Sequence, residues 1–404
     1  MSRSAVVIGA GITGTLTGHS LRKAGWDVTV LEAQAIGAGS SSRTAAGIRQ
    51  QFSTVETVLG MRYSVSFYKD FVAQVGGERA PIRQSGYLFL SRGSREPIEA
   101  RVRLQHDAGL SEVELLSSKD AHARFDWLDP AAFDHATWCP TDGFLFPADV
   151  YNEAATALQR AGGKLLQSTP VTAARHENGR IAAVASGDRW FPADLFVDAT
   201  NAWSGRLAKV LEATALPISP LKRYLWFLER AGSLSADSLE HMPLVVTPTG
   251  AYCRPENEDS LLTGWAHDAR PEPDFTYEDQ DRIDPEFFHK TGVDSKAYET
   301  WLAIAESIPP VGEFAGVTAT TSGFYATTPD HNPFLGFDPT VPNLLRLVGF
   351  SGHGAMFGPF TALVATRLAE AGRPLDDIDV LGARASLGPF RLDRQFGAHE
   401  SMVI

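Results

Sequence analysis

The sequence predicts an α/β fold with two domains: a βαβ domain of the dinucleotide-binding type and a second, discontinuous domain built on a mixed sheet. The first observation is an apolar run, residues 5–8, that leads directly into a glycine-rich turn, residues 9–14. The second is a helical stretch followed by another apolar run, residues 28–31, which ends at Glu32. Strand, glycine turn, helix, strand and terminal acid stand in the order that a Rossmann-like site requires. The third is a set of β-rich runs between residues 221 and 264, which indicates a separate sheet.

The glycine turn, Gly-Ala-Gly-Ile-Thr-Gly, assigns a separate task to each glycine. Gly9 permits the tight turn, Gly11 lets the backbone approach a pyrophosphate, and Gly14 lets the helix pack closely on the strand. The helix N-terminus favours an anion through its unpaired N–H groups and its dipole. Glu32 can accept hydrogen bonds from ribose hydroxyls. The candidate dinucleotide contacts in this unit are Gly9, Gly11, Ile12, Thr13, Gly14, Glu32 and Ala33.

Segments of the two kinds alternate along the chain, so neither domain is expected to be continuous. A helix at residues 149–163 and a buried strand at residues 195–200 return to the nucleotide-binding pattern. At 404 residues the chain exceeds the size at which one hydrophobic core keeps growing. We therefore expect a nucleotide-binding domain of residues 1–85, 146–220 and 318–404, and a substrate domain of residues 86–145 and 221–317.

Composition excludes several classes of function. A net charge of −12 argues against a nucleic-acid partner, which would need a basic surface. Cys139 and Cys253 form no CxxC pair, so we expect neither a disulfide framework nor a metal site. No run approaches the ~18 apolar residues of a membrane span, and we expect a cytoplasmic protein. Residues 271–288 are acidic and contain proline, which predicts a solvated loop that enters a helix.

Three further segments carry a family resemblance: residues 198–204, residues 325–336 and the Gly-Phe-Ser-Gly-His-Gly turn of residues 349–354. With residues 9–32 they span nearly the whole chain. In this combination and order the sequence resembles the D-amino-acid oxidase superfamily of flavoproteins. It most resembles the branch of sarcosine, dimethylglycine and glycine oxidases and dehydrogenases. The resemblance implies FAD as the cofactor of the nucleotide-binding domain. No second GxGxxG appears, so no NAD(P)H site is expected beside the flavin.

The resemblance also implies which residues contact the flavin. In the family, the turn at residues 349–354 precedes a helix whose N-terminus faces the pyrimidine edge of the ring, and residues 358–371 are a plausible helix here. Such a dipole could stabilise the anionic reduced flavin. Val171 could equally be a core valine, and the serines could lie in a surface loop. The candidate flavin contacts are Ser40, Ser41, Arg43, Val171, Thr200, Trp203, Gly352, His353, Gly354, Ala355 and Met356.

On the substrate side, Arg49 stands where sarcosine oxidases place an arginine near the flavin and the substrate carboxylate. A guanidinium offers a planar fork to a carboxylate, and the alternative is a surface arginine. Tyr325 could line the pocket or pack as a core aromatic, and His267 could be a pocket or a loop histidine. Tyr252 would line the far wall. For His353 the resemblance implies turn hydrogen bonds and flavin contact rather than a role as a base.

Departures from the family are also informative. Monomeric sarcosine oxidases tether the flavin through a cysteine where this chain has Gly323, so we expect non-covalent FAD. Their carboxylate-binding lysine is replaced here by Met356, and the lysine that promotes reaction with oxygen falls near Leu262 or Thr263. These replacements leave the substrate open, and either oxygen or an electron-transfer protein could be the acceptor.

The sequence thus predicts an FAD-dependent enzyme that oxidises the C–N bond of an amino acid or N-alkyl amino acid. Hydride would pass to the flavin, and the imine product would hydrolyse. The cofactor carries this chemistry, so an absent Ser-His-Asp or metal motif does not weigh against it. One alternative is oxidation of a 2-hydroxy acid or a glycerol phosphate, which would need a base. Another is a non-catalytic flavoprotein that serves as an assembly or scaffold factor.

Overall fold

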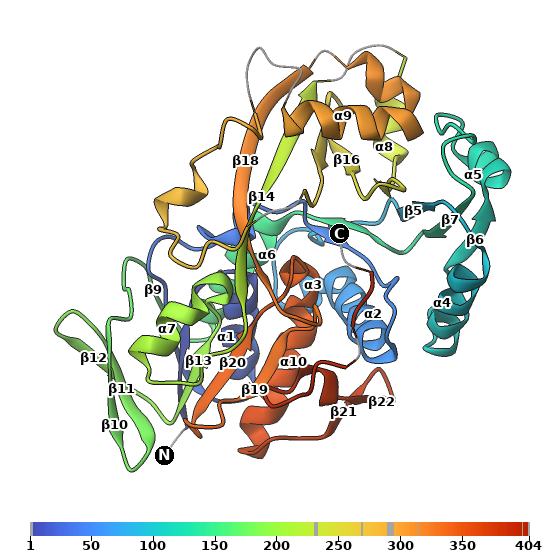
Figure 1. Ribbon diagram of the computed structural model, residues 1–404. Helices are drawn as coiled ribbons and strands as arrows, with labels where there is room; N and C mark the ends of the chain where they lie inside the picture. The colour runs from blue at the N-terminus through green and yellow to red at the C-terminus, as the bar shows by residue number, and fades with distance from the viewer. Residues whose placement is uncertain are drawn as a thin grey trace.

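The computed structural model describes residues 3–229, 233–267, 270–288, 295–314, 316–397 and 399–402. Its first large sheet has six strands in the order β19-β20-β13-β1-β2-β9 (Figure 1). Neighbouring strands in it are parallel except for β19, which runs antiparallel to β20. The strands are β1 (Ser4–Ile8), β2 (Asp27–Leu31), β9 (Lys164–Leu166), β13 (Leu195–Asp198), β19 (Phe334–Phe337) and β20 (Leu344–Val348).

Alternation along β1 explains how this sheet is covered on both faces. Ala5 and Val7 pack into one hydrophobic core, whereas Val6 and Ile8 pack into another, because successive side chains of a strand point to opposite faces. Helices α1, α2, α6 and α10 contribute to the first core. The second core lies under α7 and the antiparallel meander β10–β12. The bounds are α1 (Ile12–Lys23), α2 (Val55–Lys69), α6 (Pro147–Arg160), α7 (Ser204–Val210), α10 (Gly354–Ala371), β10 (Ala173–Glu177), β11 (Arg180–Ser186) and β12 (Arg189–Pro192).

Helix α10 begins four residues before the predicted helix and contains a proline. Pro359 has no N–H to donate to the carbonyl of Ala355 four residues earlier. The hydroxyl of Tyr68, on α2, donates to that carbonyl at 2.7 Å instead. The missing backbone hydrogen bond is thus replaced from a neighbouring helix, and α10 continues through the proline to Ala371.

The second large sheet has eight strands in the order β18-β14-β17-β16-β15-β5-β7-β6. Its pairs are antiparallel except β15 with β5, so the sheet is mixed, as predicted. Two long strands, β14 and β18, run from this sheet toward the first (Figure 1). The strands are β5 (Tyr87–Ser91), β6 (Glu114–Ser117), β7 (His135–Cys139), β14 (Ser219–Glu229), β15 (Leu244–Val246), β16 (Tyr252–Asn257), β17 (Ser260–Gly264) and β18 (Gly316–Thr327).

Smaller elements complete the described part of the chain. A small sheet has three strands in the order β3-β8-β4. Strand β21 pairs with β22 near the C-terminal end. No helix among the described residues is both long and apolar enough to cross a membrane. The remaining elements are β3 (Gly47–Ile48), β4 (Ile82–Arg83), β8 (Gly143–Leu145), β21 (Asp377–Val380), β22 (Ala383–Ser386), α3 (Phe71–Gln74), α4 (Glu96–Asp107), α5 (Ser118–Arg124), α8 (Ala236–His241) and α9 (Lys296–Ser307), with short 3₁₀ turns η1 (Ser40–Ser42), η2 (Asn201–Trp203), η3 (Glu278–Gln280), η4 (Pro309–Glu313) and η5 (Gly388–Phe390).

Each of the two large sheets draws its strands from several separate ranges of the chain. Strand β18 falls in the range assigned to the nucleotide-binding domain, yet it belongs to the eight-stranded sheet. The reason is its long antiparallel pairing with β14, from Gly316 opposite Glu229 to Thr327 opposite Ser219. The domain limits themselves remain a prediction.

Candidate active site

A cavity of about 390 Å³ lies at the carboxyl ends of the parallel strands β1, β2 and β13. This is the edge of an α/β sheet where ligands bind. Its walls also include the segment after β2, the end of β18 and the turn before α10. Predicted contacts that line it are Gly9, Gly11, Ile12, Thr13, Glu32, Ala33, Ser40, Ser41, Arg43, Val171, Thr200, Trp203, Gly352, Gly354 and Ala355, together with Tyr325 from the substrate-side set.

The glycine turn leaves no room for side chains. A Cβ on Gly9, whose φ is +102°, would lie 2.8 Å from the carbonyl oxygen of Ala199. A Cβ on Gly11 would lie 2.7 Å from the hydroxyl of Ser41, and one on Gly14 would lie 1.9 Å from the carbonyl oxygen of Gly9. Gly14 does not line the cavity, but it lets α1 approach the turn closely enough to aim its N-terminus there. The backbone of this turn is therefore open to a phosphate group.

Glu32 is fixed at the end of β2 by backbone amides. Its carboxylate accepts hydrogen bonds from the N–H of Ala10 at 2.7 Å and of Gln34 at 2.9 Å, and the residue lines the cavity. The N–H of Ile12, at the start of α1, donates to the hydroxyl of Ser41 at 3.0 Å. An acid at the second strand, a bare glycine turn and a helix N-terminus without an acidic first turn together fit an adenine dinucleotide.

A second, smaller cavity of about 40 Å³ adjoins the first and shares Thr44, Tyr325, Gly352 and Ala355 with it. Four of the five predicted catalytic residues line this second cavity: Arg49, Tyr252, Tyr325 and His353. Met356, predicted as a flavin contact, also lines it. The other lining residues are Ala45, Ala46, Gly47, Tyr87 and Leu244.

Arg49 follows β3 directly and is completely buried. Its Nη1 donates to the carbonyl of Gln51, and its Nη2 donates to the carbonyl of Met402 near the C-terminal end. Its guanidinium carbon lies 3.8 Å from the centre of the Phe52 ring. Within the described residues the buried Nε–H has no hydrogen-bond partner, so this donor is available to a ligand. The interpretation of Arg49 as a surface arginine is wrong.

The C-terminal segment holds this arginine in place. The buried carboxylate of Glu400 accepts from the backbone N–H of Ser53 at 3.0 Å and from its hydroxyl at 2.6 Å. It also accepts from the N–H of Met402 at 2.9 Å, which fixes the residue whose carbonyl meets Arg49. Glu400 and Met402 are therefore tied to the residues just before α2 and to Arg49 of the second cavity, and this stretch of the chain runs beside α2 (Figure 1).

A buried carboxylate, Asp142, lies near Arg49 on a network that the sequence analysis missed. Asp142 accepts from the backbone N–H of Gln50 at 2.9 Å, from the Gln50 side chain at 3.0 Å and from the Gln51 side chain at 3.2 Å. Burial raises the pKa of Asp142 to about 6, against the effect of these hydrogen bonds and of the Arg49 charge. The Gln51 amide also donates to the carbonyl of Tyr87, which links the network to the pocket wall.

Three tyrosines, Tyr87, Tyr252 and Tyr325, form much of the pocket wall. Burial raises the pKa of each phenol above its usual value, so all three are neutral near pH 7. Tyr325 packs against Gly352, where a Cβ would lie 2.3 Å from the tyrosine ring. Arg223, a residue of β14 that the sequence analysis also missed, has its guanidinium carbon 5.6 Å from the centre of the Tyr325 ring.

His353 is neutral as well, because burial and then the charge of Arg49 hold the pKa of its imidazole well below the usual range. Its Nε2 lies 3.2 Å from Nη2 of Arg49. An arginine N–H can only donate, so Nε2 accepts there and the ring proton is assigned to Nδ1. This arrangement agrees with a positioning role rather than with a base directed at the pocket.

His267 does not join this group and lines neither cavity. Its Nε2 lies 3.0 Å from the hydroxyl of Thr300 on α9, and its ring packs 4.5 Å from that of Trp265. The chain leaves β17 at Gly264 and carries the histidine toward α9 rather than toward the flavin side. The structure therefore does not bring His267 together with the other four substrate-side candidates.

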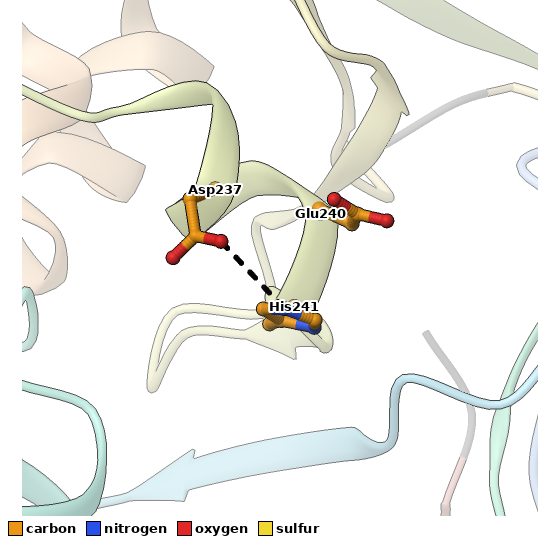
Figure 2. Close-up of side chains that lie close together, drawn as sticks. All are labelled: Asp237, Glu240 and His241. Atoms are coloured by element: carbon orange, nitrogen blue, oxygen red, sulfur yellow. Dashed lines mark ion pairs between the residues drawn. The ribbon is translucent and has the colours of Figure 1, made fainter.

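One group of potential metal ligands, Asp237, Glu240 and His241, lies outside both cavities on the short helix α8 (Figure 2). Their ligand atoms lie within 4.8 Å of one another, and an Asp237 oxygen is 3.8 Å from Nε2 of His241. All three are exposed, and exposed acidic groups are common without an ion. The geometry assigns no ligand to this group.

Comparisons with known proteins agree with the geometry. Residues 4–368 match the family model described as DAO, FAD dependent oxidoreductase. FAD-dependent oxidoreductase domain-containing protein 1 of Xenopus laevis is 25% identical over 410 residues, which cover 91% of this chain and 79% of that protein. Glycine oxidase of Pseudomonas putida is 25% identical over 392 residues, which cover 93% of this chain and 97% of the enzyme.

Among solved structures, L-proline dehydrogenase from P. horikoshii aligns with a TM-score of 0.80 at 28% identity, covering 94% of this chain and 96% of that one. The predicted fold class and the predicted FAD cofactor are confirmed by these matches. The matched range contains all four segments that carry the family resemblance. The chain therefore belongs to the DAO family of FAD dependent oxidoreductases.

Proposed function

We propose that this chain oxidises the C–N bond of a small amino acid or N-alkyl amino acid, with hydride transfer to FAD. The observation that carries the proposal is the second cavity, which joins the cofactor cavity at Tyr325 and Gly352 and is lined by the buried cation Arg49. A buried cation beside a redox cofactor favours a substrate that carries an anion. The names of the relatives, a glycine oxidase and an L-proline dehydrogenase, support an amino acid.

Cavity size supports a small substrate. A water molecule needs roughly 10–15 Å³ of such space, so the second cavity of about 40 Å³ holds about three water-sized groups. Such a small space favours glycine, its N-methyl derivatives and compact imino acids over amino acids with large side chains. Leu244, Met356 and the tyrosine rings close the space against a long or branched side chain.

The protein's own residues bind and orient rather than move a proton. The Nε–H of Arg49 would hold one carboxylate oxygen, while Gln51 and Met402 keep the guanidinium from turning. Apolar and neutral aromatic walls exclude water and so strengthen this charge interaction. Bound FAD supplies the hydride acceptor. The non-covalent attachment that Gly323 implies is part of the proposal, because glycine offers no thiol.

The polar groups of the pocket favour an amine over an alcohol as the reacting group. Oxidation of a neutral amine needs a free lone pair and good orientation, whereas oxidation of an alcohol needs a base for the hydroxyl proton. Within the described residues, no carboxylate lines the second cavity. Its one histidine, His353, faces Arg49 with Nε2. Either oxygen or an electron-transfer protein would then take the electrons from the reduced flavin.

The test is anaerobic mixing of the purified flavoprotein with panels of amino acids, N-methylated glycines, compact imino acids and 2-hydroxy acids. We expect the oxidised flavin absorbance to bleach with a compact amino acid, and ammonia, an alkylamine or a cyclic imine to form as product. Bleaching by 2-hydroxy acids alone would replace the proposal with alcohol oxidation. Failure of every compound, with dithionite still able to reduce the flavin, would favour the non-catalytic alternative.

A further inference from the structure

Residues 270–288 form a loop with many exposed residues, as the composition predicts, but the loop also buries Phe275, Gln280 and Phe287. In Figure 1 it runs down beside β18 toward the first sheet. Tyr277 from this segment lines the large cavity together with Glu32, Arg43 and Trp203. The substrate-side part of the chain thus contributes a wall to the cofactor cavity, which neither the glycine turn nor the family resemblance assigns.

Aromatic packing holds this segment against the cavity. Phe275 is only 4% exposed, and its ring stacks on that of Phe324 with centroids 3.9 Å apart. Trp203 meets Phe275 edge to face at 5.2 Å and lies 5.8 Å from Tyr277. Trp203 in turn covers Gly39, where a Cβ would lie 3.2 Å from the indole. These rings form a continuous apolar patch over one side of the cavity.

Polar contacts tie the segment to β14 and β18 on either side of Tyr277. The N–H of Glu272 donates to the carbonyl of Pro220 at 2.8 Å, and the hydroxyl of Ser322 donates to the carbonyl of Gln280. Next to the second of these anchors, Nη1 of Arg43 forms an ion pair with Oδ1 of Asp281 at 2.7 Å. The arginine lines the cavity, whereas the Asp281 side chain is 68% exposed, so this ion pair lies at the cavity's outer edge.

The hydroxyl of Tyr277 is buried and makes no hydrogen bond of normal geometry with any described residue. The side chain of Gln280 is its nearest polar neighbour within the segment, and the carboxylate of Glu32 acts on it across the cavity. A buried hydroxyl that loses water without gaining a partner is unfavourable, so such groups usually meet a ligand or a water. Because the residue lines the cavity, a bound cofactor is the partner that the geometry supplies.

We propose that residues 271–281 form a cover over bound FAD, in which Tyr277 donates a hydrogen bond to the cofactor and the Arg43–Asp281 pair latches the cover. The ribose hydroxyls and phosphates of the dinucleotide are the groups that would accept the hydrogen bond from Tyr277. Entry and release of FAD then require the latch to open. The inference concerns cofactor retention only, so it holds or fails independently of the substrate proposed above.

The first test compares Tyr277→Phe with wild type by titration of the apoprotein with FAD. Loss of one neutral hydrogen bond predicts a Kd raised roughly 3- to 10-fold. Tyr298→Phe is the matched control, since Tyr298 lies on α9 outside both cavities. Unchanged affinity in Tyr277→Phe, or an equal change in the control, would overturn the assignment of Tyr277 as a cofactor ligand.

The second test measures the rate of FAD release from the holoenzyme after dilution into an excess of a flavin trap. Asp281→Asn removes the latch charge and should speed release about 2- to 5-fold at low salt, with less effect at 1 M salt. Asp376→Asn, at the exposed pair with Arg391, is the control for loss of a surface charge. Equal release rates in wild type and Asp281→Asn at low salt would show that the pair is no latch.

Discussion

The cofactor cavity and the substrate pocket share part of their walls, yet they are built from different parts of the protein. At the glycine turn of residues 9–14 the cofactor cavity uses backbone and small residues of one short stretch, while larger side chains such as Trp203 and Tyr277 form other walls. The substrate pocket uses large side chains from segments far apart in sequence, such as Arg49, Tyr252 and His353. Backbone recognises what every member of a cofactor class shares, whereas side chains select among substrates.

The difference predicts that changes in the two cavities affect different measurements. Damage to the glycine turn should remove the cofactor and every activity that depends on it. Damage to the pocket should leave a yellow protein that handles its substrate poorly. Three of the following four changes test this separation, and the change at Asp142 tests the network behind the substrate pocket.

Gly14→Ala should weaken FAD binding strongly, because its Cβ would lie 1.9 Å from the carbonyl oxygen of Gly9. To relieve this contact, α1 or the turn must move. An overpacking cost of up to about 3 kcal/mol would lower the affinity for FAD by up to roughly 100-fold. Flavin content after purification and titration with FAD are the measurements. Gly205→Ala, on α7 with open space around the new methyl group, is the control. A yellow Gly14→Ala protein with wild-type affinity would contradict the packing argument.

Arg49→Ala should reduce kcat/KM for a carboxylate-bearing substrate while FAD stays bound. A carboxylate left without its buried partner costs roughly 2–5 kcal/mol, which corresponds to about 30- to several-thousand-fold. Arg49→Lys should fall between, because it keeps the charge but loses the Nε–H and the planar fork that Gln51 and Met402 hold in place. Steady-state kinetics at saturating FAD measure this effect. Wild-type kinetics in Arg49→Ala would remove Arg49 from the site.

Asp142→Asn should change how stability depends on pH. The folded-state pKa of Asp142 is about 6, above the value near 4 of an unfolded chain, so the folded protein holds an extra proton between these values. The stability that this proton contributes is complete below about pH 4 and is lost as pH rises through 6. Relative to Asp142→Asn, wild type should therefore lose on the order of 3 kcal/mol between pH 4 and pH 7.

Urea unfolding of the two holoproteins at both pH values measures this difference. Taking the difference between wild type and variant removes titration of the other groups, as long as they behave alike in both. A constant difference across the range would mean that Asp142 ionises in the folded protein as it does in the unfolded chain.

Glu32→Gln should weaken FAD binding about 10-fold and leave turnover at saturating FAD unchanged. The substitution removes a charged acceptor worth roughly 1.5–3 kcal/mol to a bonded donor, and its amide group must also face one of the N–H groups of Ala10 and Gln34. Titration with FAD and kinetics with excess FAD separate the two quantities. Unchanged affinity would place Glu32 away from the ribose, and a large loss in kcat would break the separation between the cavities.

The contrast between a local cofactor turn and dispersed pocket side chains also explains how much of each cavity the sequence predicts. The cofactor turn is local: strand, glycines, helix and Glu32 lie within residues 4–32, and the first sheet forms around them as expected. The pocket residues Arg49, Tyr252, Tyr325 and His353 were proposed through family resemblance rather than from periodicity. The structure brings these four together.

Other pocket features depend on contacts that no local pattern records. Met402 meets Arg49 across more than 350 positions, and Asp142 meets Gln50 across 92. His267 was misplaced because its position depends on where the chain turns after β17. Tyr277 lies in an acidic stretch, where composition describes the exposed carboxylates but not the packing of the Phe275 and Tyr277 rings. Among these features, only the position of Tyr277 has a signal in the sequence, which is the alternation of aromatic with acidic residues in that stretch.

The most direct test of the central claim is anaerobic reduction of the flavin by three matched compounds. They are the compact amino acid that reacts best, the amine that lacks its carboxylate, and the corresponding 2-hydroxy acid. The account predicts rapid bleaching by the amino acid, bleaching slower by at least about 30-fold with the amine, since the partner of Arg49 is missing, and none with the hydroxy acid. Equal rates for the amino acid and the amine, or bleaching by the hydroxy acid alone, would contradict it.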